Sequence, residues 1–148
     1  MCLKRSDIMF HILFVCTHNR CRSILCEAIT DAHAKGALKV SSAGSHPAGA
    51  IYPETLRQLA QHGYSIEGLQ STGWEALEQS PPNLVVTVCD SAAGEACPLW
   101  LGDAQKLHWP LTDPSKLSDP ELAGVAFSEV IAKIEAQVPK WLAMAQKA

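Results

Sequence analysis

Four segments of strand length carry the strongest apolar patterns along the chain. They occupy residues 8–15, 38–42, 84–88 and 106–109. The first and third are nearly continuous apolar runs, a pattern typical of strands buried on both faces of a sheet. We therefore predict a strand at each of the four positions.

Helical patterns occupy the intervals between these strands. Apolar residues at helical spacing predict a helix over 23–34, and a proline start and a glycine stop delimit a second helix over 53–62. A third helix should begin after Ser118 or Asp119, and Pro139 should kink or weaken it. Its predicted buried face comprises Phe127, Val130, Ile131, Ile134, Val138, Trp141 and Leu142.

The alternation of strands and helices predicts a single α/β domain. It favours a three-layer arrangement in which a four-stranded parallel sheet is flanked by helices. Ligands of parallel sheets bind at the carboxyl ends of the strands. The loops that follow Val15, Val88 and Trp109 should therefore meet at one edge of the sheet.

Composition narrows the classes of function. The 148 residues are 47% hydrophobic and carry a formal net charge of -3. This charge argues against broad binding to nucleic acid or to a membrane surface, because both attract basic faces. An anionic substrate would have to be attracted by local positive groups.

The state of the cysteines depends on the cellular compartment, since oxidising compartments favour disulfides. The chain has six cysteines, at positions 2, 16, 21, 26, 89 and 97. Residues 1–16 imitate a secretion signal, but His11 interrupts their apolar run, which is also too short to cross a bilayer. We therefore expect a cytoplasmic protein whose cysteines are reduced thiols available for chemistry.

The loop after the first strand carries the most specific motif. It reads Cys16-Thr17-His18-Asn19-Arg20-Cys21-Arg22-Ser23 and lies between a predicted strand and a predicted helix. Backbone N–H groups of such a loop, with the N-terminus of the helix, can surround one oxyanion while Arg22 holds two of its oxygens. The same field favours a nucleophilic thiolate at Cys16, to which Ser23 can donate a hydrogen bond. An ordinary turn with one buried cysteine is the alternative, and a Walker A loop is excluded by the missing Gly and Lys positions.

The other loop residues have two interpretations each. Asn19 can brace the loop, whereas His18 and Arg20 either add positive potential or are merely solvated. Cys21 either tunes the thiolate or packs, and Cys26 on the next helix is expected to be structural. The predicted oxyanion-binding set is Thr17, His18, Asn19, Arg20, Cys21 and Arg22. A zinc site is disfavoured, because the cysteines and histidines lack the close pairs of zinc motifs.

This stretch resembles the catalytic loop of low-molecular-weight protein tyrosine phosphatases and of the arsenate reductases that share their fold. The resemblance covers residues 12–23, 42–44, 85–98 and 112–114. It implies one domain of that fold over 1–148, with 1–7 as a short extension. It also implies that Cys16 is the nucleophile, Arg22 the oxyanion clamp and Asp113 the general acid. By itself, an Asp before a Pro is more typical of a turn or helix cap.

Two further cysteines separate reduction from hydrolysis. Hydrolysis moves no electrons, whereas reduction of arsenate to arsenite needs two, so one disulfide must form in each turnover. The stretch from Cys89 to Cys97 resembles the redox segment of thioredoxin-coupled arsenate reductases. The resemblance implies a disulfide first between Cys16 and Cys89 and then between Cys89 and Cys97. Two buried apolar cysteines are the alternative.

Spacing adds a prediction about motion. If 90–96 is a helix, Cys89 and Cys97 lie about 12 Å apart, whereas a disulfide needs Cα atoms about 5.5–6 Å apart. Gly94 and Pro98 keep such a helix short and marginal. We expect this segment to unwind when the disulfide forms.

Cofactors and partners follow from these interpretations. No tightly bound cofactor is expected, and the external reductant should be thioredoxin, with glutaredoxin or a small thiol as alternatives. Asn19, Glu27 and Ser42 resemble the ligands of a potassium site known in this family, but residues 71–73 supply no acidic partner.

The sequence thus predicts a cytoplasmic arsenate reductase that serves arsenic detoxification. Its substrate would be arsenate, with phosphate or sulfate as competing anions, and it would bind neither nucleic acid nor a membrane. A phosphatase acting on aryl phosphates and a non-catalytic regulator that binds an oxyanion or arsenite are the alternatives.

Overall fold

The computed structural model of the chain describes residues 9–77, 80–90 and 102–147. Strands and helices alternate along it much as the apolar pattern predicts. The elements are β1 (His11–Cys16), α1 (Arg22–Ala34), β2 (Lys39–Gly44), α2 (Pro53–Gln61), η2 (Trp74–Leu77), β3 (Leu84–Thr87), β4 (Gln105–His108), η4 (Pro114–Lys116) and α3 (Pro120–Lys147).

The four strands form one parallel sheet in the order β2-β1-β3-β4. In β1, Ile12 pairs with Val40 on one side and with Leu84 on the other. The chain therefore passes from β1 to one neighbour and then crosses to the opposite side of β1. Such a reversal of strand order opens a crevice at the carboxyl ends of the strands, which is where ligands bind in α/β sheets.

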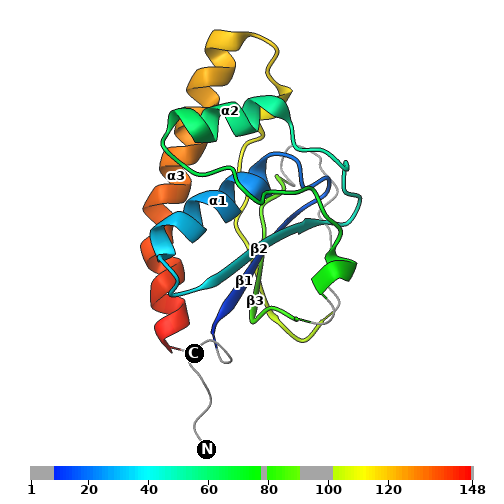
Figure 1. Cartoon of the computed structure of the whole chain (residues 1–148), viewed down its shortest axis with the longest axis vertical. Helices are drawn as coiled ribbons and strands as arrows, with labels where there is room; N and C mark the ends of the chain where they lie inside the picture. Colours follow the sequence, from blue (N-terminus) through cyan, green and yellow to red (C-terminus); the bar gives the residue numbers. More distant parts are fainter. Residues whose placement is uncertain (1–8, 78–79, 91–101, 148) are drawn as a thin grey trace, which may run out of the picture.

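The core lies mainly between the sheet and its helices. The helices α1, α2 and α3 pack together beside the sheet (Figure 1). On this side Phe14 of β1 contacts the ring of Trp141 in α3, with ring centroids 6.0 Å apart. The opposite face of the sheet carries a smaller cluster, in which Trp74 and Leu77 pack against Leu13 and Val15. The predicted α/β class with a four-stranded parallel sheet is confirmed.

Several boundaries differ from the predictions. β1 begins at His11 rather than at residue 8, because pairing with β2 begins only where His11 meets Lys39. α3 continues through Pro139 to Lys147. Pro139 removes the N–H that would bond to the carbonyl of Glu135, and both residues are exposed, so water can satisfy that carbonyl. The predicted helix over 90–96 and Cys97 fall partly or wholly outside the described residues.

The buried face of α3 agrees with its prediction except at one position. Phe127, Val130, Ile131, Ile134, Val138 and Trp141 are buried, whereas Leu142 is half-buried. Asp119 caps the helix, since its carboxylate accepts hydrogen bonds from the N–H groups of Glu121 at 2.9 Å and Leu122 at 3.3 Å. Among the described residues, no helix has both the length and the apolar character needed to cross a membrane.

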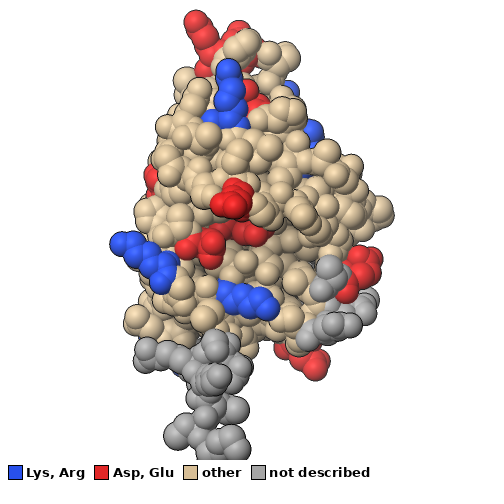
Figure 2. All heavy atoms as spheres, viewed as in Figure 1, with Lys and Arg blue, Asp and Glu red and all other residues tan. Residues whose placement is uncertain are grey.

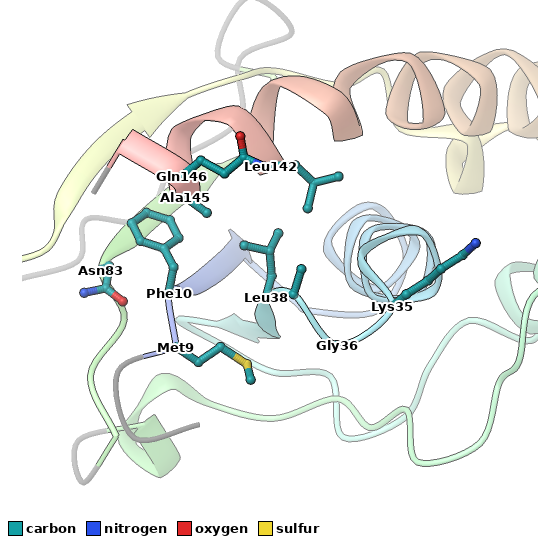
Figure 3. Close-up of a pocket in the computed structure, with 10 residues that line it drawn as sticks. Met9, Phe10, Lys35, Gly36, Leu38, Asn83, Leu142, Ala145 and Gln146 are labelled. Atoms are coloured by element: carbon teal, nitrogen blue, oxygen red, sulfur yellow. The ribbon is translucent and has the colours of Figure 1, made fainter. Parts of the chain in front are cut away.

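A cleft of about 770 Å³ opens at the amino ends of the strands (Figure 3). Phe10, Leu38 and Asn83, which immediately precede β1, β2 and β3, contribute to its lining together with Leu142 and Gln146 of α3. The carboxyl ends of the strands lie at the other edge of the sheet. This cleft is therefore separate from the loop that carries the cysteine motif.

Charged side chains are dispersed on the face shown in Figure 2, where uncharged residues predominate. This distribution agrees with the small net charge of the chain. Attraction of an anion would therefore depend on individual groups near a site rather than on the field of this face.

Candidate active site

The motif loop connects the carboxyl end of β1 to the first turn of α1. Cys16 is the last residue of β1 and Arg22 the first of α1, so the nucleophile candidate and the arginine candidate bracket one tight loop. Asn19 adopts a left-handed backbone conformation with φ 47°, which lets the loop curl. Cys21, at the N-cap position, makes no side-chain capping hydrogen bond, so an anion can occupy the positive end of α1.

The loop is closed against the end of β2 at Gly44. A Cβ atom at this position would lie 2.6 Å from the Thr17 carbonyl oxygen and 3.0 Å from the Asn19 nitrogen. Both contacts are with backbone atoms, which cannot swing away. Only glycine allows the end of β2 to approach the loop this closely.

The loop carbonyl groups turn away from the loop centre. Three of them accept hydrogen bonds from the segment after β2: Thr17 from the N–H of His46 at 2.8 Å, His18 from Ala48 at 2.9 Å and Arg20 from Tyr52 at 3.0 Å. In a trans peptide the carbonyl and the following N–H point in opposite directions. The N–H groups of His18, Asn19 and Cys21 therefore point to the opposite side, where they can act as anion donors.

The side-chain amide of Asn19 has only one workable orientation. Its Oδ1 accepts a hydrogen bond of 2.8 Å from the backbone N–H of Thr72, which can only donate. Its Nδ2 must then donate to the hydroxyl groups of Ser23 at 2.8 Å and Ser42 at 3.0 Å. Asn19 thus braces the loop, as predicted, and it also determines how the two hydroxyls are used.

Each serine hydroxyl, having accepted from Asn19, has its own hydrogen available for a different partner. The Ser23 hydroxyl lies 2.9 Å from Cys16 Sγ, so it can donate to a thiolate there. The Ser42 hydroxyl donates to Glu27 Oε1 at 2.5 Å. One amide therefore directs one hydrogen toward the nucleophile candidate and another toward a carboxylate on α1.

Arg22 and Asp113 face one another beside the loop. Arg22 Nη2 lies 3.7 Å from Asp113 Oδ2, and the two side chains are only 6% and 11% exposed. Arg22 Nη1 also donates to the carbonyl of Leu111 at 3.1 Å. The N–H of Leu111 in turn bonds to the carbonyl of Val88, so this arrangement is tied to the end of β3.

Asp113 caps a turn and also faces the motif loop. Its Oδ1 accepts hydrogen bonds from the N–H of Ser115 at 2.9 Å and from its hydroxyl at 2.6 Å, which makes Asp113 the cap of η4. Its other oxygen faces Arg22 of the motif loop. The cap therefore holds a carboxyl group close to Arg22 of the motif loop.

Cys21 and Cys26 differ from Cys16 in their surroundings. Burial raises the pKa of the Cys21 thiol to about 12, and complete burial raises the pKa of the Cys26 thiol well above its ordinary value. At neutral pH both are uncharged thiols and poor nucleophiles. This agrees with the packing role expected for Cys26.

Cys89 and Cys16 lie at the carboxyl ends of neighbouring strands, at the same edge of the sheet. Val15 pairs with Thr87, and the N–H of Val88 donates to the Val15 carbonyl at 3.0 Å. Cys16 and Cys89 thus follow adjacent residues of neighbouring strands, and both are buried. Cys89 is disulfide-bonded, whereas Cys16, Cys21 and Cys26 are free thiols. Cys97 falls outside the described residues.

The residues predicted for a potassium site lie together. Ser42 bonds to both Asn19 and Glu27, and burial raises the pKa of the Glu27 carboxyl. Asn19 turns its Nδ2 rather than its oxygen toward this group, so it presents no ligand atom in this orientation. Within the described ranges, no three His, Cys, Asp or Glu side chains are grouped as metal ligands.

The two basic loop residues, His18 and Arg20, differ in their exposure and in their contacts. His18 is exposed, and its Nδ1 lies 3.1 Å from the His46 carbonyl oxygen. Arg20 reaches Ser115 and lies over the ring of Tyr52. Sequence reasoning missed the contributions of Ser115 and Tyr52. For Ser115, the one signal in the sequence was its position two residues after Asp113, which is a common turn pattern. Nothing in the sequence indicated the contribution of Tyr52.

Comparisons with known proteins agree with this geometry. Residues 11–148 match the model of the family described as low molecular weight phosphotyrosine protein phosphatase. The arsenate reductase of Brevibacillus brevis is 31% identical over 130 residues, which cover 88% of this chain and 92% of that protein. The arsenate reductase of Bacillus subtilis is 30% identical over 116 residues, which cover 78% and 82%.

Solved structures give the same result. The crystal structure of arsenate reductase from Archaeoglobus fulgidus superposes with a TM-score of 0.73 at 28% identity, covering 89% of this chain and 98% of that one. A thioredoxin-dependent arsenate reductase of Corynebacterium glutamicum has a TM-score of 0.68 at 25% identity, covering 93% of this chain and 62% of that one.

We predict that Gly44→Ala disrupts the motif loop. The added methyl group would meet the Thr17 carbonyl oxygen at 2.6 Å, so the loop or β2 must shift. We expect a loss of about 1–3 kcal/mol in the free energy of unfolding, measured with urea, and slower alkylation of Cys16 by iodoacetamide. Gly124→Ala in α3 is the matched control, because its methyl group meets nothing within 4 Å. Equal effects of the two changes would contradict the close approach at Gly44.

We also predict that the two serines bonded to Asn19 differ in their effect on Cys16. Ser23→Ala removes the hydroxyl 2.9 Å from the sulfur, so alkylation of Cys16 at neutral pH should slow by about tenfold. Ser42→Ala removes the other hydroxyl and should change that rate by less than about twofold, because the group contacts Glu27 rather than Cys16. A larger effect of Ser42→Ala than of Ser23→Ala would contradict the hydrogen-bond directions that the Asn19 amide imposes.

Proposed function

This chain belongs to the low molecular weight phosphotyrosine protein phosphatase family, and we propose that it acts there as an arsenate reductase. The observation that supports this most directly is that Cys89 follows β3 at the carboxyl edge of the sheet where Cys16 ends the neighbouring strand β1. A phosphatase has no use for a second thiol at that place. A reductase needs one, because two electrons must leave the protein in each turnover.

The first step uses the motif loop. The Cys16 thiolate attacks arsenic, a sulfur–arsenic bond forms, and one arsenic–oxygen bond breaks. Asp113 protonates the departing oxygen, which leaves as water. Arg22 and the N–H groups of the loop hold the remaining oxygens. The burial of Arg22 and Asp113 supports these roles, because water around them would screen their charges.

The second step releases the product. A Cys89 thiolate attacks the Cys16 sulfur and forms a disulfide with it. The sulfur–arsenic bond breaks, and its electron pair stays on arsenic, which departs as arsenite. The two thiols are thereby oxidised by two electrons and arsenic is reduced by two. The adjacency of the ends of β1 and β3 supports this step, since parallel neighbours lie about 4.8 Å apart.

The third step would free the nucleophile. Cys97 attacks Cys89, which leaves Cys16 reduced and a disulfide between Cys89 and Cys97. A disulfide-bonded Cys89 together with a free Cys16 is compatible with this end state. An external dithiol protein then restores both thiols by exchange. We propose thioredoxin for this role, in the cytoplasm, because the Corynebacterium glutamicum relative is described as thioredoxin-dependent.

Hydrolysis of aryl phosphates is the second candidate function. The same loop, Arg22 and Asp113 could transfer a phosphoryl group through Cys16, and the family description refers to phosphotyrosine. A regulator that only binds an oxyanion is less well supported, because binding has no need for an acid that faces the anion site.

We propose arsenate, with phosphate or sulfate as competing anions, as the physiological ligand.

We predict that Cys89→Ser separates the two activities. With thioredoxin, thioredoxin reductase and NADPH, arsenate turnover should fall by about a thousandfold or more, because no electrons can leave Cys16. Hydrolysis of p-nitrophenyl phosphate, if the wild type shows it, should stay within about threefold, since that reaction uses only Cys16, Arg22 and Asp113.

The matched control is Cys26→Ala, which removes a buried thiol that lies in α1 rather than at the end of β3. It should leave arsenate turnover per folded molecule within a few-fold of the wild type. A parallel loss of both activities in Cys89→Ser would point to a structural role for Cys89 and would contradict the proposal.

A further inference from the structure

Arg20 extends from the motif loop to the turn that holds Asp113. Its Nη2 donates a hydrogen bond of 3.0 Å to the hydroxyl oxygen of Ser115. That hydroxyl donates in turn to Asp113 Oδ1 at 2.6 Å. Two segments that are 95 positions apart in sequence are thereby joined by a relay of two hydrogen bonds.

The direction of this relay follows from the chemistry of its first member. A guanidinium group can donate hydrogen bonds but cannot accept them. The Ser115 oxygen must therefore accept from Arg20, and its hydrogen is directed to Asp113. Arg20 thus occupies the acceptor side of this hydroxyl group, which fixes the orientation in which Ser115 donates to Asp113.

The relay distinguishes the two oxygens of Asp113. Oδ1 accepts from both the hydroxyl and the N–H of Ser115, so a proton on that oxygen would compete with two donors. A proton is accordingly favoured on Oδ2, the oxygen that faces Arg22 of the anion loop. That is the oxygen from which a leaving group could be protonated.

Arg20 is itself held in place by Tyr52. Its guanidinium carbon lies 5.0 Å from the centroid of the Tyr52 ring, and its backbone carbonyl accepts a hydrogen bond of 3.0 Å from the N–H of Tyr52. One residue thus contacts both ends of Arg20. A side chain fixed at both ends is suited to positioning a neighbour, whereas a free loop arginine would be solvated.

We propose that Arg20 is a positioning residue that, through Ser115, presents Oδ2 of Asp113 as the proton-donating oxygen. The proposal rests on the proposed function only in its use of Cys16 and Asp113. It differs from direct oxyanion binding by Arg20, which the sequence alone suggests. In this arrangement Arg22 holds the anion and Arg20 orients the acid.

The test compares two aryl phosphate substrates whose leaving groups differ in how much they need protonation by an acid. Phenyl phosphate has a poor leaving group that needs a proton, whereas p-nitrophenyl phosphate has a good one that needs it less. In Arg20→Met, kcat/KM should fall about tenfold for phenyl phosphate and about twofold or less for p-nitrophenyl phosphate. Ser115→Ala should give the same pattern, and Arg20→Lys, which keeps one donor, should recover part of the loss.

Two further measurements separate positioning from binding and from misfolding. The inhibition constant of inorganic phosphate should stay within about twofold in Arg20→Met, since Arg22 and the loop remain. In an Asp113→Asn background, Arg20→Met should cost nothing more, because the acid through which it acts is already lost. A full additional loss there, a weaker phosphate affinity, or an unchanged Ser115→Ala enzyme would overturn the proposal.

The outcome is distinguishable from that of the proposed function. If wild-type protein hydrolyses aryl phosphates but does not reduce arsenate, the reductase proposal fails and the leaving-group comparison still applies. If it reduces arsenate but does not hydrolyse aryl phosphates, the same variants are compared by arsenate turnover. In that assay, the Arg20→Met change must lower turnover in the otherwise wild-type protein. It must cause no further decrease in the Asp113→Asn variant. Turnover of neither substrate would overturn both proposals.

Discussion

The orientation of the Asn19 amide is the interaction on which the site depends. Thr72 offers it only an N–H, so its oxygen is committed there and its nitrogen must serve Ser23 and Ser42. Thr72 is in turn held by the end of β2, where the N–H of Gly44 donates to its carbonyl at 2.9 Å. A glycine that lets a strand approach the loop is thus connected, through three successive hydrogen bonds, to the hydroxyl group of Ser23 that faces Cys16.

In the proposed mechanism, one group of residues binds the anion and a different residue carries the electrons away. The motif loop, Arg22 and Asp113, which we propose as the anion site, are connected to the carboxyl edge of the sheet. Cys89, which we propose as the electron carrier, follows the neighbouring strand rather than the loop. Buried neutral thiols at Cys21 and Cys26 do not compete with Cys16. In the proposed mechanism, the second thiol therefore lies outside the loop that would bind the anion.

The sequence predicts the fold well, because strands and helices rest on local patterns, and the residues that it selects around Cys16 and Arg22 do lie close together. Apolar runs locate the strands, and the spacing of Cys16 and Arg22 around a strand–helix junction indicates the anion loop. Strand ends are less predictable, because they depend on pairing between strands. The start of β1 at His11, for example, coincides with its first pair, to Lys39 of β2. The roles of Tyr52, Leu111 and Ser115 were not predictable, because their contacts join segments that only the folded chain brings together.

In the proposed mechanism, one disulfide forms for each arsenate reduced. It is tested most directly by mixing fully reduced protein with excess arsenate in the absence of any reductant, then counting arsenite released and thiols lost. We expect two thiols to be lost for each arsenite released, at most one arsenite per chain, and no thiol loss with phosphate. Arsenite release without thiol loss, or loss of thiols without arsenite, would contradict it.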